Sequence, residues 1–283
     1  MQQTKKFNLR QHVTDQIIKA MEAGTPPWRQ PWTGSTALPR LPLRHNGEAY
    51  RGINILVLWA SAHAQGFGSA KWMTYRQAAE LGGQVRKGEK ATRSAFYGTF
   101  EDKNGDGHER IPFLRCNAVF NADQIDGLPE AFYIRPAPPQ DLGTKTDARL
   151  MSFFDATGIA RKTSSNPRAY YDTERDFVHM PPVETFHSTA AYFATLGHEC
   201  AHATGHSSRL DRFANNESRE DYAFDELVAE LASAMLGDHL GLPPAFDQNA
   251  AYIETWINAM RADQSVIFKA AAEAERAFDF LTN

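Results

Sequence analysis

The chain is poor in the features that mark secreted, membrane-spanning and repetitive proteins. Its 283 residues include only two cysteines, Cys116 and Cys200, too few for a disulfide framework, so we expect two reduced thiols. No apolar run approaches the roughly 18 residues of a transmembrane helix, and the N-terminus has no apolar signal-peptide segment. We find no internal repeat and no low-complexity segment. These absences predict a cytoplasmic protein with no membrane partner.

Net charge is also small, at −4, but it is unevenly distributed. Residues 1–135 contain 18 Lys and Arg against 12 Asp and Glu, whereas residues 136–283 contain 12 against 22. A basic half joined to an acidic half indicates an anionic partner for the first and chemistry in the second. The length suits two ordinary domains. We therefore expect one domain at 1–133, a proline-rich linker at 134–146 and a second domain at 147–283.

Five consecutive residues carry the clearest chemical signal, and they read His198-Glu199-Cys200-Ala201-His202. On a helix, positions i and i+4 share a face, so both imidazoles can bind one ion with Glu199 beside it. This is the H-E-x-x-H arrangement of zinc metallopeptidases, in which the glutamate takes a proton from the metal-bound water. Ser188 is placed to cap this helix and Gly205 to end it. The motif predicts a metal site with Glu199 as catalytic base.

A catalytic zinc needs a third protein ligand. The metzincin pattern would place a histidine where Ser208 stands, and His206 comes two positions early, so that pattern fails. The helical segment 221–236 offers Glu226 and Glu230 instead, in the gluzincin layout of two histidines from one helix and a glutamate from the next. We assign Glu226 as ligand and Glu230 as the outer acceptor that orients a ligand histidine; the exchange of these roles stays open. The expected cofactor is one divalent ion, zinc, with manganese or another divalent ion as the alternative.

Aromatic and cationic residues are interleaved in the basic half. Single-strand binders combine a cationic groove with aromatic rings on which bases stack. Core packing is the competing explanation for each tryptophan, and a solvated surface is the competing explanation for the cations. The residues expected to bind single-stranded DNA are Trp28, Arg29, Trp32, Arg44, Tyr50, Arg51, Lys71, Trp72, Arg76, Arg86, Lys87 and Lys90.

Local patterns in the basic half predict both helices and strands. Helices are expected at 8–23, capped by Asn8, and at 53–65, and strand-like runs at 92–100 and 111–121. The polar turn between these runs begins like a calcium loop, but it lacks the required glutamate at the twelfth position, and a hairpin turn explains it better.

The acidic half should be α+β as well. We expect helices at 147–157, 248–261 and 264–281, with short strands at 169–171 and 176–180. In a zincin such an edge strand holds an extended substrate beside the metal. Either tyrosine of the first strand could supply an oxyanion donor.

Several stretches in order resemble one known family. They include Tyr50-Arg51-Gly52-Ile53-Asn54, Trp72 to Gln77, Gly82 to Glu89, Val119-Phe120-Asn121, Asp176 to Pro181, the H-E-x-x-H helix, and Glu226 to Leu231. The chain resembles the ArdC antirestriction proteins of conjugative plasmids, which are related to the front of a plasmid primase, over nearly its whole length. The resemblance implies a mixed α/β domain that binds single-stranded DNA, followed by a zincin-like peptidase domain, and protection of incoming plasmid DNA from host restriction. The peptidase substrate would be an unidentified protein, with a host restriction component as one candidate.

Two other functions compete with this prediction. In the first, the protein is a DNA-binding shield whose metal site is structural or inactive. In the second it is a nuclease, which the histidine-rich ligand set disfavours because nucleases of the two-metal class use carboxylate-rich sites.

Overall fold

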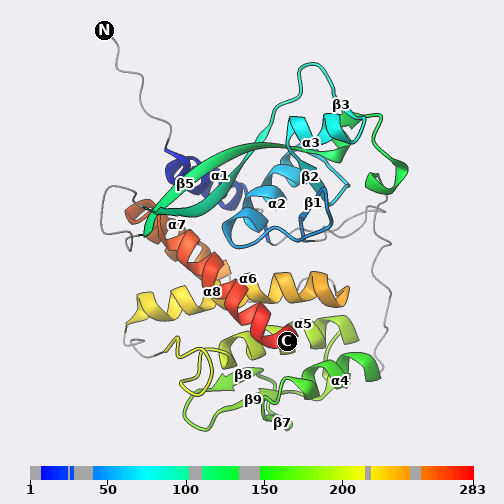
Figure 1. The fold of residues 1–283 in the computed structure, drawn as a ribbon. Coiled ribbons are helices and arrows are strands. Elements are labelled where there is room, and N and C mark those ends of the chain that lie inside the picture. The colour runs from blue at the N-terminus through cyan, green and yellow to red at the C-terminus, as the bar shows by residue number, and fades with distance from the viewer. Residues whose placement is uncertain are drawn as a thin grey trace.

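The computed structural model describes residues 8–24, 26–28, 41–101, 110–133, 147–213, 218–242 and 250–283. It confirms the α+β prediction, because helices and mixed sheets occur in both halves of the chain (Figure 1). We call the described residues up to 133 the N-terminal half and those from 147 the C-terminal half. The expected linker at 134–146 lies outside the described residues.

Helices of the N-terminal half begin where the sequence places capping residues. The side chain of Asn8 accepts a hydrogen bond from the backbone N–H of Gln11, and Thr74 forms a capping box with Gln77. Both devices satisfy backbone donors that a helix start leaves unpaired. The helices are α1 (Leu9–Glu22), α2 (Ile53–Gln65) and α3 (Tyr75–Glu80).

The N-terminal sheet has the strand order β1-β2-β5-β4. Strands β1 and β2 are parallel, whereas β2 with β5 and β5 with β4 are antiparallel. Strands β3 and β6 form a separate antiparallel pair. The bounds are β1 (Leu43–Arg44), β2 (Lys71–Met73), β3 (Gln84–Val85), β4 (Thr92–Glu101), β5 (Arg110–Asn121) and β6 (Ile125–Asp126).

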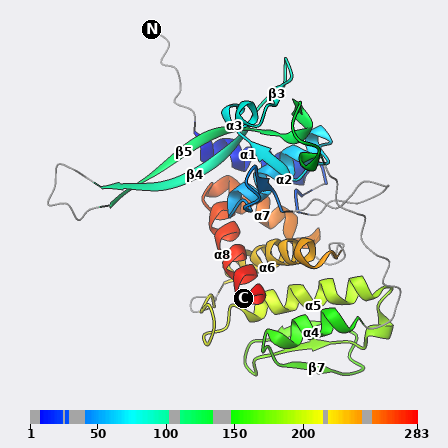
Figure 2. The same cartoon turned by 45° about the vertical axis from the view of Figure 1, so that its right-hand side comes forward.

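The hairpin of β4 and β5 is the longest strand pair in the described part of the chain. It confirms the two strand-like runs predicted from the sequence, and its far end projects well beyond the helices (Figure 2). The calcium-like turn that joins the strands lies outside the described residues. The inner part of the hairpin is fixed to α2, because the amide of Asn54 bonds to both the carbonyl and the N–H of Ala95.

The C-terminal half stacks long helices on a small sheet. Strands β7 (Arg161–Thr163), β9 (Phe177–Met180) and β8 (Tyr170–Asp172) lie in that order, and β8 is antiparallel to β9. The two strands expected from the sequence are therefore confirmed as β8 and β9. The helices are α4 (Ala148–Ala156), α5 (Thr189–Ala203), α6 (Arg219–Leu240), α7 (Ala250–Ala262) and α8 (Val266–Thr282).

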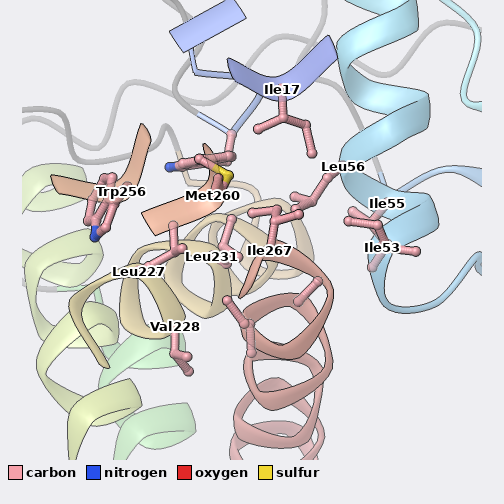
Figure 3. Close-up of a cluster of buried hydrophobic side chains, with 14 of the residues drawn as sticks. Ile17, Ile53, Ile55, Leu56, Leu227, Val228, Leu231, Trp256, Met260 and Ile267 are labelled. Atoms are coloured by element: carbon pink, nitrogen blue, oxygen red, sulfur yellow. The ribbon is translucent and has the colours of Figure 1, made fainter. Parts of the chain in front are cut away.

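One apolar core runs through both halves. Figure 3 shows Ile17 of α1 and Leu56 of α2 close to Met260 of α7, Ile267 of α8 and Leu231 of α6, and all belong to one buried cluster. Burying side chains of this size stabilises a fold by about 1.5–3 kcal/mol each. The helices of the two halves therefore share a core that neither half completes alone.

Polar contacts also cross between the halves. The guanidinium of Arg51, just before α2, pairs with Glu275 and Asp279 of α8. Arg261 of α7 pairs with Glu22 of α1. None of the helices in the described ranges combines the length and apolar character needed to cross a membrane.

Candidate metal centre and nucleic-acid interface

The H-E-x-x-H residues lie on the last turns of α5. Ser188 caps the start of this helix by accepting the backbone N–H of Ala191, as predicted. The helix ends at Ala203 with Thr204 as its C-cap, so the run ends at Gly205 as predicted. Gly205 is also required by packing, because a Cβ there would lie 2.6 Å from the ring of Phe213.

Helix α6 brings Glu226 to the two histidines. A capping box of Ser218 and Asp221 sets the start of α6. The Nε2 atoms of His198 and His202 are 3.1 Å apart; Oε2 of Glu226 lies 3.6 Å from the first, and Oε1 of Glu226 lies 3.5 Å from the second. One donor atom from each residue falls within 4.8 Å of the others. Two imidazole nitrogens and a carboxylate that converge in this way fit a divalent ion.

The same groups interact strongly with one another. Burial opposes ionisation of Glu226, but the hydrogen bonds and charges of His198 and His202 outweigh burial and hold its pKa well below the ordinary value. Burial also opposes the charged form of His202, yet Asp225 and Glu226 raise its pKa well above the usual range. The site is therefore arranged to hold positive charge.

Asp225 is the functional residue that sequence reasoning missed. Its carboxylate accepts a hydrogen bond at 2.6 Å from Nδ1 of His202, leaving Nε2 to face Glu226. Its other oxygen accepts from Nε of Arg212, also at 2.6 Å. This is the outer partner that orients a ligand histidine. Asp225 directly precedes the predicted ligand, and that adjacency was the only signal in the sequence.

Glu230 lies one turn beyond Glu226 on α6 and is buried. On His202, Asp225 occupies the nitrogen that we had expected Glu230 to approach. A role for Glu230 beside the other ligand histidine stays a prediction. Glu199 follows His198 on α5 and is partly buried.

A second polar cluster lies beside the end of α5. Asp176 has a left-handed backbone with φ 52°, and its carboxylate accepts three hydrogen bonds from Arg209 and one from the Tyr171 hydroxyl at 2.7 Å. Arg209 also donates to the carbonyl of Ala203. The cluster therefore ties the β-sheet to the helix that carries the histidines. It also occupies the hydroxyl of one of the two tyrosines that we considered as oxyanion donors.

The structure contradicts part of the predicted DNA-binding set. Trp28 is only 3% exposed and Trp72 only 1%, so neither ring can stack on a base and these two predictions were wrong. Trp28 packs edge-on against Trp256 with ring centroids 6.4 Å apart, and Trp72 packs against Phe67 at 5.9 Å. Tyr50 is buried as well, and the prediction was also wrong for its ring.

Those of the other predicted DNA-binding residues that the structure describes are all lysines and arginines, and none of them is buried. Arg29 and Trp32 lie outside the described residues. Four arginines pair with carboxylates: Arg44 with Glu48, Arg51 with Glu275 and Asp279, Arg76 with Glu80, and Arg86 with Glu89 and Asp126. Lys87 and Lys90 are exposed, and Lys71 is partly exposed over the ring of Phe132. DNA contact by these cations stays a prediction.

Exposed aromatic rings do occur in the N-terminal half, at positions that we had not selected. They are Tyr75 at the start of α3 and Phe96 and Tyr97 on β4. Phe96 lies opposite Arg115 on β5, and Tyr97 lies beside Arg10 of α1. Alternation along the predicted strand 92–100 could have indicated that one of these two adjacent rings faces solvent.

Comparisons with known proteins give a family match for each half of the chain. A family model described as a zincin-like metallopeptidase matches residues 148–273, and a model described as the N-terminal domain of anti-restriction factor ArdC matches residues 7–120. A metal-free crystal structure of antirestriction ArdC protein from plasmid R388 is 54% identical, covers 97% of each chain and has a TM-score of 0.89. The chain belongs to the ArdC antirestriction family.

Further matches are a metal-bound ArdC structure, a rhizobial protein and a DNA primase. A Mn(II)-bound crystal structure of the R388 ArdC protein matches with 54% identity, 97% coverage of each chain and a TM-score of 0.86, which supports a divalent metal in this family. Protein y4eC of Sinorhizobium fredii (strain NBRC 101917 / NGR234) is 38% identical over 96% of this chain and 90% of its own length. DNA primase TraC of Escherichia coli is 37% identical over 96% of this chain, which spans only 27% of the primase.

Proposed function

We propose that the C-terminal half is a metal-dependent peptidase. The observation that carries this proposal is the convergence of His198, His202 and Glu226 within 4.8 Å, with Glu199 on the same helix as the histidines. Two nitrogens and one carboxylate are the donor set of gluzincin-type zinc sites, and zinc is our preferred ion. The Mn(II)-bound relative keeps manganese as the alternative.

A divalent ion held by these residues acts as a Lewis acid that lowers the pKa of water and polarises a carbonyl oxygen. Glu199 takes the proton of the attacking water and then delivers it to the leaving amine. Asp225 holds His202 in the orientation that presents Nε2 to the site. Strand β8 lies at the edge of its sheet and contacts α5, and an extended substrate can add to such an edge.

The N-terminal half binds single-stranded DNA without sequence preference in this proposal. Support comes from the ArdC family and from exposed rings next to cations on the hairpin, where Phe96 faces Arg115 and Tyr97 adjoins Arg10. Stacking on aromatic rings tolerates any base, because every base has a π face. The protein would act in the cytoplasm, where incoming plasmid DNA meets host restriction, and its peptide substrate would be a protein of that system.

The competing function is a DNA shield in which the metal site is structural or inactive. One experiment separates the two: restriction protection in cells that express wild type, Glu199→Ala or Glu184→Ala at matched levels. Glu184 is an exposed glutamate that precedes α5 and serves as the control. Purified proteins would be checked for metal content and for binding to a fluorescent oligonucleotide.

Peptidase function predicts that Glu199→Ala loses protection while metal and DNA binding remain and Glu184→Ala behaves as wild type. Full protection by Glu199→Ala would refute proteolysis as the mechanism and favour the shield.

A further inference from the structure

A peptidase of this kind needs a hydrogen-bond donor for the carbonyl oxygen that gains negative charge as water attacks. One such donor is worth about 10²–10³ in kcat. The residues assigned so far hold the metal and move the proton, and none of them performs this task. The donor must keep its proton, reach the metal centre and remain accessible to substrate.

The nearest donors of the C-terminal half have other partners. Arg212 is bound to Asp225, and Arg209 is bound to Asp176. The Tyr171 hydroxyl also donates to Asp176. Each of these groups is bound to a carboxylate that is not one of the three assigned metal ligands.

Tyr222 differs from them in exposure and position. It is 54% exposed, so a substrate can reach its side chain. It lies four residues before Glu226 on α6, so the two side chains share a face of the helix, and the hydroxyl interacts with the Glu226 carboxylate. The Ser218 capping box fixes the turn from which Tyr222 projects.

The ring of Tyr222 packs against an aromatic residue of α7. Its centroid lies 6.0 Å from that of Tyr252 on α7, and Tyr252 stacks on Trp256 at 6.1 Å. The indole N–H of Trp256 donates to the carbonyl of Ala223 at 2.7 Å, which attaches this aromatic stack to the backbone of α6. The phenol is thus positioned beside the ligand Glu226 while much of its surface faces solvent.

We propose that Tyr222 is a catalytic residue whose hydroxyl donates a hydrogen bond to the oxyanion of the peptide substrate; this inference rests on the proposed peptidase function. Water oxygen bonds to the carbonyl carbon, its proton passes to Glu199, and the π electrons move to the carbonyl oxygen, which accepts from Tyr222. The carbon–nitrogen bond then breaks, and the amine nitrogen takes the proton from Glu199. Tyr222 keeps its own proton throughout.

The test is Tyr222→Phe in the Mn(II)-loaded protein of 283 residues, because this change removes one oxygen and keeps the ring. Three quantities are measured: hydrolysis of fluorescein-labelled casein, affinity for Mn(II), and affinity for a peptidyl phosphonamidate, whose tetrahedral anion imitates the oxyanion. We expect kcat and phosphonamidate affinity to fall by about 10²–10³. KM and Mn(II) affinity should stay within about twofold of wild type. Tyr75→Phe, the same change at a 53% exposed tyrosine on α3, should alter none of them.

Unchanged phosphonamidate affinity in Tyr222→Phe would overturn the proposal. A loss of Mn(II) affinity that matched the loss of activity would also overturn it, because Tyr222 would then only support Glu226. The phosphonamidate measurement separates this inference from the peptidase function. If wild type binds the inhibitor but cleaves no casein, the casein result counts against hydrolysis, and the inhibitor comparison alone decides the role of Tyr222. Wild type that binds no inhibitor refutes the donor assignment.

Discussion

Removing the Asp225 carboxylate should weaken both the fold and the metal site. Asp225 is 4% exposed, and the Arg212 side chain that it binds at 2.6 Å is 5% exposed. Asp225→Ala would leave this guanidinium with Thr204, the carbonyl of Ala201 and the ring of Phe213 as its partners among the described residues. Breaking a buried ion pair from one side costs about 3–5 kcal/mol, and losing the outer partner of a ligand histidine lowers metal affinity about 10–100-fold.

Two assays measure these losses: urea unfolding of the metal-free protein and calorimetric titration with Mn(II). Asp225→Asn keeps the shape and should lose less stability than Asp225→Ala. The control is Glu80→Gln, which breaks the exposed Arg76–Glu80 pair and should change unfolding by no more than about 0.5 kcal/mol. If Asp225→Asn bound Mn(II) as tightly as wild type, Asp225 would not be the group that orients His202.

Lowering the pH should reduce the difference in the free energy of unfolding between wild type and Asp225→Asn. Burial opposes ionisation of Asp225, but His202 and Arg212 lower its pKa below the ordinary 3.8. A carboxylate with a lowered native pKa stabilises the fold above its unfolded pKa, and this contribution is lost as pH falls through the native value. The difference between the two proteins should therefore shrink below about pH 4.

Three further predictions concern other parts of the molecule. Tyr97→Ala should weaken binding of a fluorescent oligonucleotide by about 1–3 kcal/mol, whereas buried Trp72→Phe should lower stability without that loss; equal DNA affinities for Tyr97→Ala and wild type would count against stacking on the hairpin. Gly205→Ala should destabilise by about 1–3 kcal/mol in urea unfolding, because its methyl group would meet the Phe213 ring, and a neutral result would contradict the packing argument. Cys200 is fully buried, and burial raises its pKa to about 12, so mass spectrometry should find it unmodified by iodoacetamide at pH 8 until urea unfolds the chain.

Local signals in the sequence predicted local structure well. Asn8 and Ser188 each cap the helix that they were expected to begin, because a cap depends on residues within one turn. The i, i+4 spacing of His198 and His202 likewise fixed their common face before any tertiary contact was known. Glu226 could be selected because the gluzincin layout limits the third ligand to the following helix.

Local signals could not predict which side chains are buried or which residues hydrogen-bond to the ligand histidines. Trp28 was expected to bind DNA, but its ring packs against Trp256, which lies more than two hundred residues away in the chain. Nothing local to Trp28 indicates that contact. Asp225 was missed for a related reason, since its carboxylate has a role only after α6 has been placed against both His202 and Arg212.

The shared core shows that the two halves of the chain are not independent folding units, although their compositions differ. Their opposite charge and their separate family matches suggest two independent units joined by a linker. The apolar faces of α1 and α2, however, pack on α6, α7 and α8, and Arg51 pairs across the same boundary. Periodicity shows that a helix has an apolar face, but it does not show which helix covers that face. Because α6 carries Glu226 and also packs in this core, the structure that positions the ligand includes residues of the N-terminal half.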